Sequence, residues 1–136
     1  GSSGGAIIAP SKCRDGILTL LAVLSFVARK GHKLHKLVDD FPKYYNLRKK
    51  IEFEPKKHDS IKRYLKNYYS GKGFEIRETG GIKGGLKAVP DKDSFVWFRA
   101  SKTEPNAFRI IADSDKKEEA ERLLEEAVEI FSKANE

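Results

Sequence analysis

The chain has 136 residues, which is enough for one domain with a hydrophobic core or for a smaller domain with an extension. Charged residues make up 35% and hydrophobic residues 39%, a balance typical of a soluble globular chain. The longest apolar run, residues 17–28, is too short to span a bilayer. The single cysteine, Cys13, excludes an internal disulfide and fits a reduced, cytoplasmic setting.

The net charge of +7 is unevenly distributed. Residues 1–72 carry 16 Lys or Arg against 6 Asp or Glu, whereas residues 73–136 carry 11 against 14. A basic first half can attract nucleic acid, an acidic protein or phosphorylated small molecules, but it is also what a solvated surface looks like. The absence of methionine and the start GSSGG predict a fragment of a longer protein.

The first predicted elements are two helices. Asp15 is a suitable N-cap for a helix over 16–29, and Gly31 would end it. Apolar residues cover nearly the whole circumference of this helix, so we expect it to be buried on several sides. A short helix over 34–40 would stop before Pro42.

The pattern changes from residue 44 onwards. The expected elements are a strand over 46–54, a helix over 60–69, short strands over 74–77 and 86–89, an inner strand over 95–98, a strand over 107–112 and a last helix. Asp115 and Glu118 would form a capping box at the start of that helix. The order predicts an α+β domain, with an antiparallel sheet of about four strands and two helices on one face.

The segment RASKTEP, residues 99–105, lies between the last two strands. If it is nearly extended, Arg99, Ser101 and Thr103 point the same way because they are two residues apart. A guanidinium fork and two hydroxyls suit a tetrahedral oxyanion such as phosphate. Lys102 would add positive potential, and Arg109 on the next strand could lie beside the loop. An ordinary hairpin with polar turn residues has the same spacing.

The segment RASKTEPNAFR resembles the phosphate-binding loop of the α-D-phosphohexomutases, the phosphoglucomutase/phosphomannomutase family. That loop has the pattern R-[PA]-S-[GN]-T-E-P, followed by an arginine on a strand. The matching residues are Arg99, Ser101, Thr103, Glu104, Pro105 and Arg109. Lys102 replaces the usual Gly or Asn, and would be strained if that position required a positive φ.

Further segments resemble the family in the same order along the chain. Residues 13–17 (CRDGI) resemble a helix start near the end of its third domain, and residues 37–45 (LVDDFPKYY) resemble the segment leading into its last domain. Gly81-Ile82-Lys83 resembles the D-G-x-K strand, with Gly80 in place of Asp. In the first residues, Ser3 matches a sugar-recognition loop, G-E-x-S-G-[HG], whose glutamate is absent.

The resemblance implies two parts. Residues 1–42 would be the helical tail of a truncated third α/β domain, and residues 43–136 the C-terminal phosphate-binding α+β domain. The intact isomerase would interconvert hexose 1-phosphate and hexose 6-phosphate, with Mg²⁺ and a hexose bisphosphate activator. The chain contains neither the family's serine loop, T-A-S-H-N-P, nor its metal loop, D-G-D-x-D-R. We therefore expect it to be inactive alone, with no catalytic residue and no metal ligand of its own.

The site residues implied are Arg99, Ser101, Lys102, Thr103 and Arg109 for the non-reacting phosphate, with Ser3 a weaker candidate for the sugar. The expected partners are the phosphosugar and the N-terminal domains of the same enzyme, with no membrane. The sugar could be glucose, mannose or glucosamine.

A basic module that binds nucleic acid or protein is the alternative. Two lysine pairs, 49–50 and 56–57, and two tyrosine pairs, 44–45 and 68–69, would supply a basic patch with aromatic side chains. No RRM or KH signature accompanies them, which argues against RNA binding.

Overall fold

The computed structural model describes residues 5–39, 41–80 and 84–136. It divides into two units, one up to Pro42 and one from Lys43 to Glu136. Each unit is described by itself.

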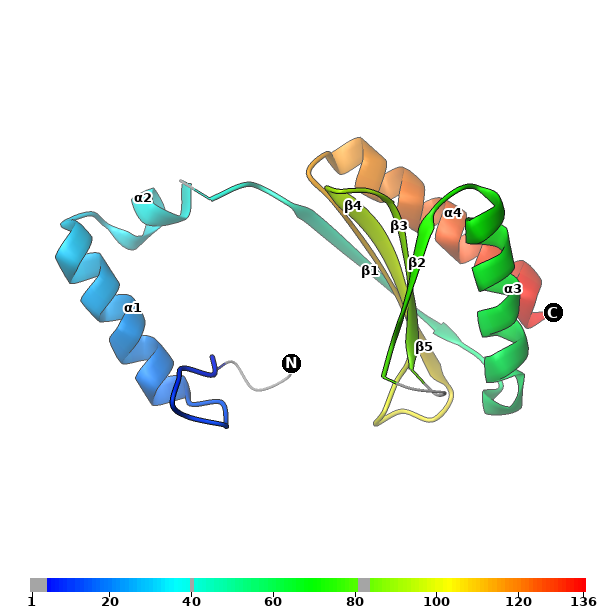
Figure 1. The fold of residues 1–136 in the computed structure, drawn as a ribbon, viewed down its shortest axis with the longest axis horizontal. Helices are drawn as coiled ribbons and strands as arrows, with labels where there is room; N and C mark the ends of the chain where they lie inside the picture. The colour runs from blue at the N-terminus through cyan, green and yellow to red at the C-terminus, as the bar shows by residue number, and fades with distance from the viewer. Residues whose placement is uncertain (1–4, 40, 81–83) are drawn as a thin grey trace. The chain divides into compact units, whose positions relative to one another are not determined.

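The first unit contains the two predicted helices, α1 (Gly16–Lys30) and α2 (Leu34–Asp39) (Figure 1). The Asp15 carboxylate accepts a hydrogen bond of 2.8 Å from the Leu18 N–H, and Gly31 ends α1 with φ of 67°, so both caps are confirmed. The expected burial of α1 is not seen within the described residues, where no residue of this helix is buried. None of the helices in the described ranges is long and apolar enough to cross a membrane.

The second unit is built on an antiparallel sheet. Its described residues form five strands, β1 (Tyr45–Glu52), β2 (Glu75–Thr79), β3 (Gly85–Asp91), β4 (Ser94–Ala100) and β5 (Ala107–Ser114). Their spatial order is β1-β5-β4-β3-β2, so β4 is an inner strand as predicted. The sheet has one strand more than the four expected, because the two short strands β2 and β3 pair with each other.

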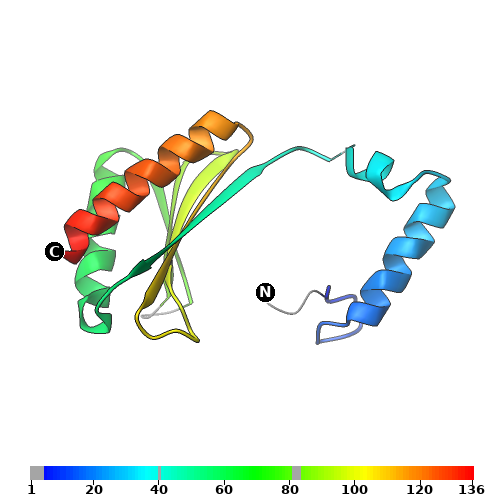
Figure 2. The same ribbon diagram turned by 180° about the vertical axis from the view of Figure 1, so that it is seen from behind.

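Two helices cover one face of this sheet, which confirms the predicted α+β architecture. A 3-10 turn, η1 (Pro55–Lys57), leads into α3 (His58–Gly71), and α4 (Lys117–Asn135) follows β5. The helix α3 packs against β2 and β3, whereas α4 packs against β5 and β1 (Figure 2). Among the described residues of this unit, no helix lies on the opposite face of the sheet.

The predicted capping box at the start of α4 is wrong. The N-cap is Lys116, and no side chain caps the helix. Instead, the buried Ser114 hydroxyl accepts the Lys116 N–H at 3.2 Å and lies 3.0 Å from the Ser94 hydroxyl. Contacts within the sheet therefore fix the turn before the helix, and Glu118 contributes only a negative charge near the helix N-terminus.

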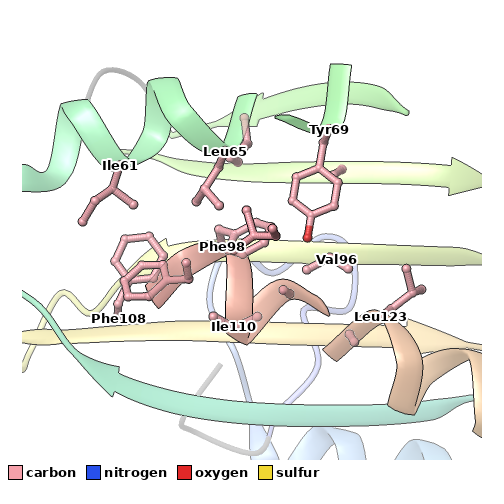
Figure 3. Packing of buried hydrophobic residues seen from close by; sticks show 14 of the residues in the cluster. Ile61, Leu65, Tyr69, Val96, Phe98, Phe108, Ile110 and Leu123 are labelled. Carbon is pink, nitrogen blue, oxygen red and sulfur yellow. The ribbon is translucent and has the colours of Figure 1, made fainter. Parts of the chain in front are cut away.

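The core lies between the sheet and the two helices. Figure 3 shows Ile61, Leu65 and Tyr69 of α3 pointing towards Phe98 of β4 and Phe108 of β5. The buried side chains of α4 are Ala120, Leu123, Ala127, Ile130 and Phe131. Alternate residues of β4 and β5 point into this layer, so the residues between them point to the helix-free face.

The pH dependence of this unit should be influenced by Glu78 at the end of β2. Its carboxylate lies 2.7 Å from the Lys62 ammonium and 2.8 Å from that of Lys66. Hydrogen bonds from these two lysines lower the pKa of Glu78 to about 2. Because the folded pKa lies below the unfolded one, the stabilisation is complete above about pH 4.5 and is lost as the pH falls towards about 2.

Over this range the wild-type chain should lose more stability than Glu78→Gln, whose side chain does not titrate. Urea unfolding followed by the fluorescence of Trp97, the single tryptophan, would measure this at each pH. The control is Glu125→Gln, an exposed glutamate on α4 with no ion pair among the described residues. Equal pH dependence of the wild type and Glu78→Gln would contradict the prediction.

Candidate functional site

Three segments meet at one end of the sheet. They are the β1–α3 connection, the end of β2 at Thr79 and Gly80, and the β4–β5 loop, residues 101–106 (Figure 1). A pocket of about 480 Å³ lies between them, and its lining includes Phe53, Lys56, His58, Gly80, Ser101 and Lys102. The β4–β5 loop is thus beside a pocket formed by segments distant in sequence.

The loop itself is bent at 102–104 rather than extended. The Ser101 hydroxyl accepts the Glu104 N–H at 3.2 Å and the Thr103 N–H at 3.4 Å. The Ser101 N–H donates to the Ala107 carbonyl at 2.8 Å, which closes the loop at its base. The condition that the loop be extended is therefore not met, because the Ser101 hydroxyl stabilises a turn instead.

This turn brings two of the predicted residues together. The Ser101 and Thr103 hydroxyl oxygens are 3.4 Å apart, and Thr103 is exposed. Lys102 lies between them in sequence and is also exposed. No non-glycine residue in the described ranges has a positive φ, so lysine at position 102 carries no left-handed strain. The departure of Lys102 from the family pattern is thus compatible with the loop.

The two predicted arginines form a second pair. Arg99 of β4 and Arg109 of β5 are register partners on adjacent antiparallel strands, on the helix-free face. Directly opposed side chains have Cβ atoms only about 5 Å apart, and two like charges there repel each other. The Arg99 guanidinium lies 5.0 Å from the centre of the Trp97 ring, which gives it a cation–π contact.

The backbone of β3 at Gly85 lies very close to Trp97 of β4. A Cβ added to Gly85 would lie 2.5 Å from the Trp97 indole nitrogen and 2.8 Å from the Phe98 carbonyl. Only glycine fits there without displacement of β4. Gly85 therefore allows β3 to lie against the strand that carries Arg99.

The second arginine is held by Glu104. An Arg109 N–H donates to one Glu104 oxygen at 2.9 Å, and the Lys50 ammonium donates to the other at 2.6 Å. Hydrogen bonds from Lys50 and then Arg109 hold the pKa of Glu104 below its usual range, so its carboxylate stays ionised at neutral pH. Lys50 belongs to β1, at the register position opposite Arg109.

The remaining predictions have different outcomes. Ser3 lies outside the described residues. Lys50, Trp97 and the pocket residue His58 were not assigned to the loop from the sequence. Lys50 could not be assigned from the sequence, because its place opposite Arg109 depends on the β1–β5 register. The described ranges contain no group of three or more His, Cys, Asp or Glu side chains that could hold a metal ion.

The chain is similar to known sugar-phosphate mutases. Residues 2–45 match the family model described as phosphoglucomutase/phosphomannomutase, alpha/beta/alpha domain III. A phosphoglucomutase/phosphomannomutase of Thermococcus kodakarensis is 29% identical over 98% of this chain and 28% of its own length. A phosphoglucosamine mutase of Methanocaldococcus jannaschii is 30% identical over 88% of this chain and 26% of its own length.

A phosphoglucosamine/phosphogalactosamine mutase of Sulfurisphaera tokodaii is 27% identical over 94% of this chain and 27% of its own length. The chain thus spans about a quarter of the length of the curated relatives it matches. These alignments cover both units of the chain, whereas the domain model covers little beyond the first. Taken together, they show that the chain belongs to the α-D-phosphohexomutase, or phosphoglucomutase/phosphomannomutase, family.

Proposed function

We propose that the second unit holds the non-reacting phosphate of a phosphosugar while a phosphohexomutase interconverts its 1-phosphate and 6-phosphate forms. Arg99, Ser101, Lys102, Thr103 and Arg109 are the residues that would contact this phosphate. Binding a remote phosphate orients the sugar, so its binding energy assists a reaction at the other end of the molecule.

The opposed pair Arg99 and Arg109 is the observation that carries this proposal. Their side chains start from directly opposite positions on adjacent strands, so two positive charges are brought close together. Glu104 pairs with Arg109, whereas Arg99 has the Trp97 ring as its neighbour, so Arg99 can still pair with an anion. Ser101 and Thr103 place two hydroxyls together in the loop that joins these strands. An oxyanion would accept hydrogen bonds from both pairs and would relieve the repulsion.

The chemical step would belong to other segments of the enzyme. The chain has no serine loop and no triple-aspartate loop of the kind the family uses, so Mg²⁺ and the hexose bisphosphate would act through those segments. Residues 1–42 would belong to the third domain, whose other elements would cover the exposed apolar side chains of α1, among them Ile17, Leu20 and Leu24.

The sugar is a hexose or an aminohexose on this proposal. The relatives are named for glucose, mannose, glucosamine and galactosamine phosphates, and each is aligned with most of this chain. A phosphate-binding loop recognises what these substrates have in common, so it would not choose among them.

Titration with inorganic phosphate and with glucose 6-phosphate tests the proposal. With ¹⁵N-labelled chain, we expect amide shifts confined to residues 99–109 and the neighbouring pocket. Sulfate at the same ionic strength reports the contribution of general anion binding. A short RNA serves as the competing ligand. Shifts on RNA addition that centre on residues 49–69, with none in the loop on phosphate addition, would overturn the proposal.

The structure weakens the alternative of an RNA-binding patch. Tyr69 is completely buried in the core and cannot stack on a base. Tyr45 is the first residue of β1, whereas Lys56 and Lys57 follow its end, so an eight-residue strand separates them. At about 3.3 Å per residue this is roughly 25 Å, so Tyr45 does not lie beside this lysine pair.

A further inference from the structure

Glu104 connects the β4–β5 loop to two strands of the sheet. One carboxylate oxygen accepts from Arg109 of β5 and the other from Lys50 of β1, at 2.9 Å and 2.6 Å. Glu104 also donates its N–H to the Ser101 hydroxyl, and its carbonyl accepts the Ala107 N–H at 3.1 Å. Its backbone thus closes the turn, while its side chain anchors that turn to the sheet.

The position of the Arg109 side chain depends on Glu104, because the other charged neighbours of Arg109 are positive. Arg99 has the Trp97 ring as its neighbour, whereas Arg109 has Glu104 as its one ion-pair partner among the described residues. Without Glu104, the opposed guanidinium of Arg99 and the ammonium of Lys50 would both repel Arg109. The Arg109 side chain would then turn towards solvent and away from the loop.

We propose that Glu104 is a positioning residue, which holds Arg109 and the Ser101 turn in the arrangement that receives the phosphate, with Lys50 as its second anchor. This inference rests on the proposed function. The contacts are partly exposed to solvent, with 42% of the Glu104 side chain accessible. Exposed ion pairs contribute little to overall stability, so the role of Glu104 is in orientation rather than in holding the domain folded.

The direction in which one substitution changes phosphate affinity separates this positioning role from a purely electrostatic one. A carboxylate near an anion site repels the anion, so removing its charge would by itself strengthen phosphate binding. Loss of a positioning contact has the opposite effect, because Arg109 and the turn would have to be ordered when phosphate binds. Glu104→Gln should therefore weaken phosphate affinity if Glu104 positions the site, and strengthen it if Glu104 acts only as a charge.

The matched control is Glu52→Gln. Glu52 is the last residue of β1, opposite Ala107 at the same end of the sheet, and its carboxylate has no ion pair among the described residues. Its removal changes the local charge by the same amount without breaking a contact of the loop. We expect Glu104→Gln to bind inorganic phosphate about tenfold more weakly than wild type, which is the order of magnitude for the loss of one hydrogen bond to a charged group. We expect Glu52→Gln to bind at least as tightly as wild type.

The second anchor is tested in the same titration. Lys50→Arg keeps a donor for Glu104 and should retain phosphate affinity, whereas Lys50→Gln should weaken it. The urea midpoint reported by Trp97 fluorescence should be unchanged in all four variants. This would separate a defect in binding from a defect in folding.

Amide hydrogen exchange of residues 101–107 without phosphate provides a readout that does not depend on any ligand. Exchange should be faster in Glu104→Gln than in wild type or Glu52→Gln. If phosphate binds the wild type but Glu104→Gln keeps or gains affinity, or exchanges at the wild-type rate, the positioning role is overturned alone. If the wild type binds no phosphate, the proposed function is overturned and this inference with it.

Discussion

The Arg99→Ala chain is expected to bind inorganic phosphate about 10- to 100-fold more weakly than the wild-type chain, since a hydrogen bond to a charged group is worth about 1.5–3 kcal/mol. Arg99 lies at the end of β4, beside the loop and opposite Arg109, so its guanidinium can reach an anion held there. Isothermal titration calorimetry with phosphate would measure the change. The Trp97 fluorescence midpoint in urea should remain near the wild-type value.

Two further variants sharpen the interpretation. Arg63→Ala removes the same charge from an exposed position on α3, where no ion pair is seen in the described part of the chain, and should leave phosphate affinity unchanged. Arg99→Lys keeps the charge but loses the planar fork, so its affinity should fall between those of the wild type and the alanine variant. Equal affinity of Arg99→Ala and the wild type would remove Arg99 from the proposed site.

The Phe98→Ala chain is expected to lose about 3–5 kcal/mol of the free energy of unfolding of the second unit, as is usual for truncation of a buried phenylalanine. Phe98 is only 1% exposed, and its ring centre lies 5.5 Å from that of Tyr69 on α3. Truncation leaves a cavity where β4 meets α3 (Figure 3). Urea unfolding followed by Trp97 fluorescence reports this unit directly, because Trp97 precedes the truncated residue.

Phe41→Ala is the matched control for this second prediction. It makes the same chemical change at a side chain that is 63% exposed, in the first unit. Its Trp97 transition should coincide with that of the wild type. A small loss for Phe98→Ala, similar to that for Phe41→Ala, would show that β4 and α3 do not share the close packing that their contact implies.

Local patterns predicted most of the elements, for identifiable reasons. The cap at Asp15 and the stop at Gly31 depend only on neighbouring residues, and both were confirmed. The apolar stripes of α3 and α4 have helical spacing, and the inner position of β4 follows from apolar residues on both of its faces. All five strand segments were expected, but the sheet was given about four strands, because short segments become strands only when a partner supplies their hydrogen bonds.

One error lies where a contact between distant residues decides the local structure. The predicted capping box from Asp115 to Glu118 gave way to Ser114, whose buried hydroxyl pairs with Ser94 of a neighbouring strand. The other difference is local: an extended loop was considered from the sequence, but hydrogen bonds from Thr103 and Glu104 to the Ser101 hydroxyl bend it. The Ser101 and Thr103 hydroxyls still lie close together, but a turn brings them together rather than the alternation of side chains along an extended segment.

The sequence by itself determined the family, through the spacing of Arg99, Ser101, Thr103 and Arg109 and the order of the surrounding segments. It also determined the helices and the inner strand, since these follow from hydrophobic spacing along the chain. Only the tertiary structure placed Arg99 opposite Arg109, and Lys50 beside Glu104. Strand register decides which side chains face each other, and register depends on pairing between segments far apart in the sequence, such as Tyr45 with Ser114.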